Sequence, residues 1–127
     1  MSRTPVTVSL DQDVAVIAVD NPPVNTLAAA VREGLFAALA DIRTRPRVAA
    51  VVLICEGSTF ISGADIAEFA GPPKEAEFRD LFRQLEQLAV PVVAGMHGTA
   101  MGGGLEIALA CHYRVAAPDA QIGRAHV

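Results

Sequence analysis

Cysteine and histidine are scarce in this chain of 127 residues. The two cysteines, Cys55 and Cys111, stand in apolar segments without metal-binding or redox spacing, and the three histidines are isolated from one another. We therefore expect both cysteines to be buried thiols in a reducing compartment. The same spacing gives no grounds for a metal site, and we expect the chain to bind no metal.

Basic runs, a signal peptide and long apolar runs are also missing. The net charge is −4, and without a lysine- or arginine-rich run this argues against nucleic acid as a partner. No apolar run has the length of a membrane span, and the first residues lack a signal-peptide core. We therefore expect an intracellular chain that does not bind membranes. A hydrophobic content of 52% suffices for a substantial core in one domain or part of one.

Apolar spacing in the first half predicts a hairpin, a helix and a strand. Val6–Leu10 and Val14–Val19 are typical of two paired strands. A helix follows, for which Asn25 or Thr26 is the expected cap. Its apolar stripe consists of Leu27, Val31, Leu35, Leu39 and Ile42. The continuously apolar run Val48–Ile54 is typical of a parallel strand covered on both faces.

The second half repeats the order of helix and strand. An amphipathic helix follows Lys74, and its apolar positions are Phe78, Leu81, Phe82, Leu85 and Leu88. Pro91–Met96 reads as a buried strand, and His112–Ala117 reads as a short one after a further helix. This order predicts an α/β layered domain with a largely parallel sheet and right-handed crossovers.

Three consecutive glycines, Gly102–Gly104, join the strand at Pro91–Met96 to the following helix. Glycine lets a backbone approach a ligand closely, and a helix start offers unpartnered N–H groups at an electropositive end. Such a group can hold a carbonyl oxygen that gains negative charge. Glu106 lies one turn further, and its carboxylate is expected to overhang the same spot. The alternative is structural: the glycines allow tight packing, and Glu106 only caps the helix.

A second glycine-bearing turn, Phe60–Ile66, follows the strand at Val48–Ile54. In a parallel sheet both turns lie at the carboxyl edge of their strands, where ligands bind. Backbone N–H groups from the two turns can therefore converge on one oxygen atom. That arrangement is an oxyanion hole.

Together, these segments resemble the enoyl-CoA hydratase/isomerase, or crotonase, family. The resemblance is carried by Ser62–Ile66 and Gly102–Glu106, with Asn21–Asn25 ahead of them and Ala108–Ala116 behind. The sequence at His97–Ala100 and Cys111–Arg114 is similar to that of the hydratase portion of bifunctional enoyl-CoA hydratase/3-hydroxyacyl-CoA dehydrogenases. The resemblance implies a crotonase-like layered fold of repeated ββα and βα units, truncated at the C-terminus.

The resemblance also implies roles for particular residues. The N–H groups of Ala64 and Gly103 hold the thioester oxygen of an acyl-CoA, and Glu106 is one of two glutamates that position and activate water. Substrate-binding residues are Gly63, Ala64, Asp65, Ile66, Gly102 and Gly103. The implied reaction adds water to a 2-enoyl-CoA in fatty-acid β-oxidation. It needs no cofactor beyond the coenzyme A thioester, and NAD belongs only to a dehydrogenase part.

The chain departs from the family pattern after Gln121. The resemblance implies a second catalytic glutamate in the register of His126. We expect residues 1–121 to be the N-terminal part of the family domain and residues 122–127 to be a non-native tail. Such a chain is expected to be inactive alone, and a homo-oligomer would form through segments that it lacks.

Two alternative functions remain: isomerisation of an enoyl-CoA, and a non-catalytic CoA-binding module. The expected compartment is the cytoplasm of a bacterium, or the peroxisome or mitochondrion of a eukaryote.

Overall fold

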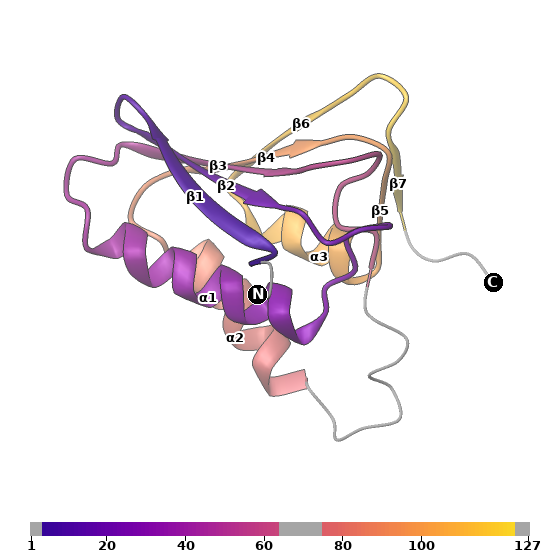
Figure 1. Cartoon of the computed structure of the whole chain (residues 1–127), viewed down its shortest axis with the longest axis horizontal. Helices are drawn as coiled ribbons and strands as arrows, with labels where there is room; N and C mark the ends of the chain where they lie inside the picture. The colour runs from indigo at the N-terminus through magenta and orange to yellow at the C-terminus, as the bar shows by residue number, and fades with distance from the viewer. Residues whose placement is uncertain (1–3, 64–74, 124–127) are drawn as a thin grey trace.

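The computed structural model describes residues 4–63 and 75–123. Its main sheet has five strands in the order β1-β2-β3-β4-β6 (Figure 1). Their bounds are β1 (Val6–Asp11), β2 (Val14–Val19), β3 (Ala50–Cys55), β4 (Val92–Met96) and β6 (Tyr113–Ala116). β1 and β2 form an antiparallel hairpin, whereas β2, β3, β4 and β6 run parallel. The predicted hairpin and the largely parallel sheet are confirmed.

Among the described residues, three helices lie on one side of this sheet (Figure 1). They are α1 (Ala29–Arg43), α2 (Glu75–Glu86) and α3 (Gly103–Ala110). Every second residue of β2, β3 and β4 is buried, and the residues between them are only half-buried. The prediction that Val48–Ile54 is covered on both faces is therefore wrong for the described residues. Val52 and Ile54 are among those that stay half-buried, because a run of apolar residues does not reveal how many layers cover a strand.

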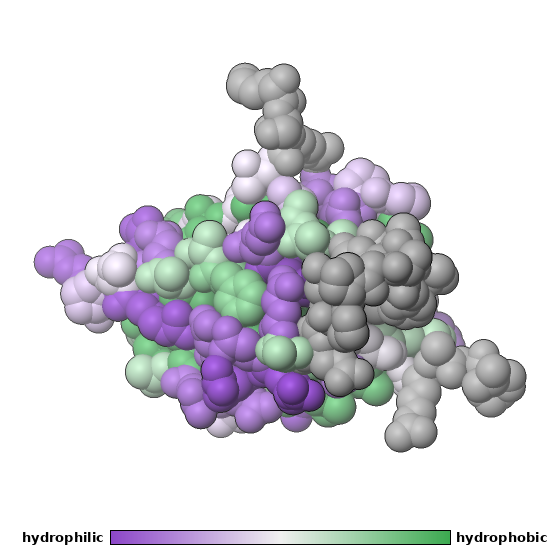
Figure 2. All heavy atoms as spheres, turned by 90° about the horizontal axis from the view of Figure 1, so that it is seen from below, coloured by the Kyte–Doolittle hydropathy of each residue, from purple (hydrophilic) through white to green (hydrophobic). Residues whose placement is uncertain are grey.

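The helices bury the apolar positions that the sequence assigns to them. On and just before α1, the whole predicted stripe is buried: Leu27, Val31, Leu35, Leu39 and Ile42. On α2, Leu81 and Leu85 are fully buried, while Phe78 and Phe82 pack against the core at its margin. The outer surface on this side mixes polar and apolar side chains (Figure 2). Periodicity alone therefore identified the faces of both helices correctly.

The predicted capping of α1 by Asn25 or Thr26 is wrong. The helix begins at Ala29, and Ala28 occupies the N-cap position without a side-chain hydrogen bond. The carbonyl and hydroxyl oxygens of Thr26 accept hydrogen bonds from the side-chain amide of Asn21 instead. Both predicted caps make other hydrogen bonds: Asn25 bonds to the Glu56 and Thr59 carbonyls, and Thr26 bonds to Asn21. These contacts hold the two residues in the loop, so the helix starts after them.

A second, two-stranded sheet stands apart from the main one. β5 (Thr99–Met101) pairs in parallel with β7 (Gln121–Gly123). The sequence predicts only a turn between β4 and the glycines, because a strand of three residues has too little periodicity to detect. The expectation of a non-native tail at 122–127 stays a prediction, and residues 124–127 lie outside the described part of the chain.

Cys55 and Cys111 are both buried and free, as predicted. Burial raises the pKa of the Cys55 thiol to about 12 and that of the Cys111 thiol likewise to about 12, because a thiolate loses its hydration there. Cys111 also donates from its sulfur to the Ile107 carbonyl oxygen at 3.4 Å. Both thiols are therefore protonated and unreactive in the folded chain.

The thiols are expected to make the fold sensitive to alkaline pH. An unfolded thiol ionises from pH 9.0 upward, whereas the folded thiols stay protonated to about pH 12. The raised pKa thus gives stability that is fully present below pH 9 and is lost between pH 9 and 12, on the order of 1 kcal/mol per pH unit for each thiol. Urea unfolding at several pH values measures this slope. The Cys55→Ala/Cys111→Ala variant should have a shallower slope; an identical slope contradicts the prediction.

Candidate functional site

The turn after β3 and the start of α3 touch each other. A Cβ atom at Gly104 would lie 1.8 Å from the carbonyl oxygen of Ile61, so the two backbones meet without room for a side chain. A Cβ atom at Gly63 would lie 3.4 Å from the carbonyl oxygen of Met101. The prediction that both glycine-bearing turns meet at the carboxyl edge of the sheet is confirmed for their described residues.

Hydrogen bonds between loops hold this junction. The N–H of Phe60 donates to the His97 carbonyl at 2.7 Å. Thr99 donates its N–H to the Thr59 hydroxyl at 2.6 Å, and that hydroxyl donates to the Thr99 carbonyl at 2.9 Å. The Nε2 atom of His97 lies 2.8 Å from the Gly57 carbonyl oxygen. These bonds tie the segment after β3 to the segment that leads into α3. Sequence reasoning missed Thr59 and Thr99, because a threonine in a loop gives no distinctive local signal.

Asn25 braces the same turn from a third segment. Its side-chain amide donates to the carbonyls of Glu56 at 2.8 Å and Thr59 at 2.7 Å, and its Oδ1 accepts from the Asn21 N–H at 2.7 Å. Its φ of 53° lies in the left-handed region, which asparagine tolerates better than most residues. Asn25 is buried, and it locks the loop before α1 onto the turn after β3.

We expect Asn25→Ala to destabilise the fold by about 3 kcal/mol. The change leaves the buried carbonyl of Thr59, and the partly buried Glu56 carbonyl and Asn21 N–H, without their partner. A buried group left unpaired costs about 1–3 kcal/mol, and the contributions of neighbouring groups do not simply add. Chemical denaturation measures the loss. Gln12→Ala is the matched control, because Gln12 has a φ of 57° but an exposed side chain. Equal losses at the two positions would mean that backbone strain, rather than the hydrogen bonds, explains the effect.

α3 begins at the predicted glycines. Gly103 is its first residue, and Gly102 is the N-cap with φ 51° and ψ −119° and no side-chain cap. The Glu106 N–H donates to the Gly102 carbonyl at 2.9 Å. The N–H groups that precede Glu106 in the helix therefore have no acceptor within it, and the helix dipole makes this end electropositive. The helix start can thus receive an oxygen that carries negative charge.

Arg114 on β6 caps the other end of α3. Its Nη1 atom donates to the carbonyls of Ala108 at 3.1 Å and Cys111 at 3.0 Å. A cation at the C-terminal end complements the helix dipole, as does the carboxylate of Glu106 in the first turn. The sequence does not predict this capping role of Arg114, because Arg114 lies on the strand after the helix that it caps. The helix is therefore held at both ends.

The structure describes some of the predicted site residues and not others. Glu106 lies in the first turn of α3 with an exposed side chain. Gly63 and Gly103 are half-buried, and Gly102 is exposed. The other predicted site residues, Ala64, Asp65 and Ile66, lie outside the described part of the chain. His126, which stands at the position expected for the second glutamate, also lies outside it. The described members are gathered at one junction, while their roles stay predictions.

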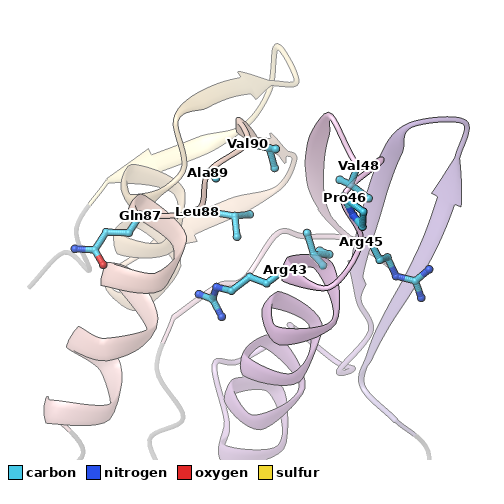
Figure 3. Close-up of a pocket in the computed structure, with 9 residues that line it drawn as sticks. Arg43, Arg45, Pro46, Val48, Gln87, Leu88, Ala89 and Val90 are labelled. Carbon is cyan, nitrogen blue, oxygen red and sulfur yellow. The ribbon is translucent and has the colours of Figure 1, made fainter.

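A hollow of about 450 Å³ lies at the opposite edge of the sheet (Figure 3). It is formed by the end of α1, the approach to β3 and the connection from α2 to β4, including Arg43, Val48, Leu88 and Val90. Because it stands at the amino ends of the strands, it is not part of the candidate site.

Within residues 4–63 and 75–123, no group of three or more His, Cys, Asp or Glu is placed to hold a metal ion. No helix in those ranges has the length and apolar character of a membrane span.

Comparison with known proteins places this arrangement in one family. Residues 9–127 match the family model described as enoyl-CoA hydratase/isomerase. The chain belongs to the enoyl-CoA hydratase/isomerase family. It is 44% identical over 112 residues to the peroxisomal bifunctional enzyme of Danio rerio. It is 42% identical over 127 aligned positions to the peroxisomal fatty acid beta-oxidation multifunctional protein AIM1 of Arabidopsis thaliana. These matches cover 88% and 93% of this chain, but 16% and 18% of the two relatives.

Solved structures of the family have the same fold. The enoyl-CoA hydratase from Bacillus anthracis superimposes with a TM-score of 0.87 at 32% identity, over 94% of this chain and 50% of that one. The predicted crotonase-like α/β fold is therefore confirmed. This chain spans about half the length of that enoyl-CoA hydratase.

Proposed function

We propose that the chain contributes the acyl-CoA site of an enzyme that adds water across the double bond of a 2-enoyl-CoA. The product is a 3-hydroxyacyl-CoA. In this proposal the N–H groups of Gly103 and Ala64 hold the thioester oxygen, while Glu106 positions and activates the water. Gly63, Asp65, Ile66 and Gly102 contact the CoA thioester.

The contact of Gly104 with the Ile61 carbonyl is the observation that carries the proposal. It sets the electropositive start of α3 against the turn that contains Gly63. The Gly63 carbonyl accepts a hydrogen bond from the Leu27 N–H at 2.8 Å, and it shares a planar peptide unit with the N–H of the next residue. Hydration builds enolate charge on the thioester oxygen, and one preorganised donor to such charge is worth about 2.7–4 kcal/mol of barrier.

A non-catalytic CoA-binding module is the second candidate. Hydration in the family uses two glutamates, as the sequence resemblance implies, and Glu106 is the one predicted catalytic carboxylate among the described residues. The chain of 127 residues is therefore proposed to bind acyl-CoA with little or no hydratase turnover of its own. Isomerisation of an enoyl-CoA would use the same oxyanion hole with other acid–base residues, and an assay with a 3-enoyl-CoA distinguishes it.

The proposed hydration needs no cofactor besides the CoA thioester, which is the substrate. NAD enters only through a 3-hydroxyacyl-CoA dehydrogenase part of the kind that the resemblance to bifunctional enzymes implies. The names of the relatives from Danio rerio and Arabidopsis thaliana support a peroxisomal site and a place in fatty-acid β-oxidation if the source is a eukaryote. A homo-oligomer is also part of this proposal.

Titration with cinnamoyl-CoA beside a crotonyl-CoA hydration assay tests the proposed function. We expect saturable binding and a red shift of the cinnamoyl absorbance, because polarisation of the thioester carbonyl extends conjugation. Gly103→Pro removes the proposed donor N–H and is therefore expected to abolish the shift. The variant should still fold, because proline is tolerated at the first position of a helix. Gly103→Ala keeps the N–H and is the control.

Each outcome of that titration has a distinct meaning. Absence of binding to the wild-type chain would overturn the proposed CoA site. Binding with an unshifted spectrum, or a shift that survives Gly103→Pro, would overturn the oxyanion-hole assignment. Turnover of crotonyl-CoA by purified, monodisperse 1–127 chain that Glu106→Gln abolishes would show that the chain is active alone.

A further inference from the structure

Arg32 is a buried cation that stands close to the candidate site. It lies on α1 and is only 1% exposed. Its Nε donates to Glu77 Oε1 at 2.9 Å, and its Nη1 donates to the Leu27 carbonyl at 2.8 Å. Its Cζ lies 4.8 Å from the centroid of the Phe78 ring. The guanidinium is therefore enclosed by α1, by the loop before it and by the first turn of α2.

One residue connects this guanidinium to the Gly63 turn. Leu27 is fully buried, its carbonyl accepts from Arg32, and its N–H donates to the Gly63 carbonyl at 2.8 Å. Leu27 lies in the loop before α1, where no regular element fixes its backbone. The direction of the Leu27 peptide groups, and with it the position of the Gly63 carbonyl, therefore depends on the donor that Arg32 supplies.

Stability alone gives no reason to bury this charge. Removing a cation from water costs several kcal/mol, and well-packed apolar side chains often replace a buried ion pair without loss. An ordinary surface pair at the C-terminal end of α1 joins Asp41 to Arg45, which follows the helix: the Arg45 Nε–Asp41 Oδ2 distance is 3.2 Å, with side chains 43% and 41% exposed. The Arg32 guanidinium differs from this surface pair because it is buried, and a hydrogen bond that it donates in a low-dielectric interior is stronger than one at the surface. Arg32 has the properties of a group that sets geometry.

We propose that Arg32 is a positioning residue that holds the Gly63 turn against the start of α3. Glu77 is its counter-ion and orients the guanidinium toward Leu27. The consequence for thioester polarisation rests on the proposed function, because Gly63 immediately precedes the amide assigned to the oxyanion hole. Arg32 touches no reacting atom and acts through Leu27. Its loss therefore reduces the polarisation of a bound thioester more than the affinity for CoA.

The first test needs no ligand. Amide hydrogen exchange of Leu27, followed by NMR in the 127-residue chain, reports the bond from Leu27 to Gly63 directly. We expect Arg32→Met to accelerate this exchange at least about tenfold by freeing the Leu27 peptide. Arg32→Lys keeps the charge but not the forked donors, so it restores the protection in part. Arg45→Met removes an exposed arginine just beyond the C-terminal end of α1, far along the chain from Leu27; it is the control and leaves the exchange of Leu27 unchanged.

The second test follows the cinnamoyl-CoA spectrum in the same variants. We expect Arg32→Met to lose at least half of the red shift while the dissociation constant changes less than about threefold. Glu77→Gln has a smaller effect of the same sign, and because the Glu77 side chain is 35% exposed this variant folds even if Arg32→Met does not. Arg45→Met retains the full shift.

The two tests separate the positioning role from the proposed function. A wild-type chain without a red shift contradicts the oxyanion hole, whereas the exchange of Leu27 still decides what Arg32 does. Unchanged Leu27 exchange in folded Arg32→Met overturns the positioning role. If Arg32→Met does not fold, unchanged exchange in both Glu77→Gln and Arg32→Lys overturns it. A red shift that survives in Arg32→Met with accelerated exchange also overturns it, because Arg32 would then serve only local structure.

Discussion

Gly104→Ala is expected to destabilise the chain by about 3 kcal/mol or more. Inside a helix this change normally stabilises by about 0.5–1 kcal/mol. Here the new Cβ would lie 1.8 Å from the Ile61 carbonyl oxygen and 2.8 Å from the Ile61 carbonyl carbon. Neither atom is the end of a flexible side chain, so the backbone of α3 or of the turn after β3 must move. Overpacking of this kind costs about 1–3 kcal/mol and sometimes more.

Thermal and urea unfolding measure this loss of stability, and Gly123→Ala is the control. No atom lies within 4 Å of a Cβ built at Gly123, and its φ is not positive. We expect that control to stay within about 0.5 kcal/mol of wild type. The displaced junction should also lose the red shift of bound cinnamoyl-CoA. A Gly104→Ala chain as stable as the control would mean that α3 and the Ile61 carbonyl are further apart than described.

The sequence sufficed to predict the main sheet, because its strands and helices have regular apolar periods. β2 was predicted with its observed bounds, and the stripe from Leu27 to Ile42 is buried throughout. The two glycine turns could be assigned to one edge because parallel strands end on the same side. The wrong prediction about coverage of Val48–Ile54 has a physical cause: half-buried and fully buried apolar residues look alike in a sequence.

The parts that sequence reasoning did not predict depend on contacts between distant residues. Asn25 looks like a helix cap, yet its side chain bonds to carbonyls 31 and 34 residues away. Arg32 follows an apolar stripe position directly, and only the fold brings Glu77 to it. Side-chain to main-chain bonds of this kind leave no periodic trace. The candidate site was therefore located by its glycines and by family resemblance, while the side chains that hold it were not.

Glu106→Gln is expected to lower kcat for hydration of crotonyl-CoA at least about a hundredfold in a form of the protein that turns over this substrate. Glutamine keeps the shape of the side chain and an oxygen that accepts a hydrogen bond from water, but it cannot take up a proton. Affinity for the CoA thioester is expected to stay within about threefold, because Glu106 contacts the water and not the nucleotide in the proposed arrangement. Steady-state kinetics beside a binding titration measures both quantities.

Glu33→Gln on α1 is the matched control for this prediction, since Glu33 is exposed and lies on another helix. It removes the same charge and should leave kcat unchanged. The stability of Glu106→Gln separates the two roles that its position allows. A carboxylate in the first turn of α3 interacts with the helix dipole, so its loss costs about 0.3–1 kcal/mol whether or not it is catalytic. If only that small loss is seen and kcat is unchanged, Glu106 merely stabilises the helix start.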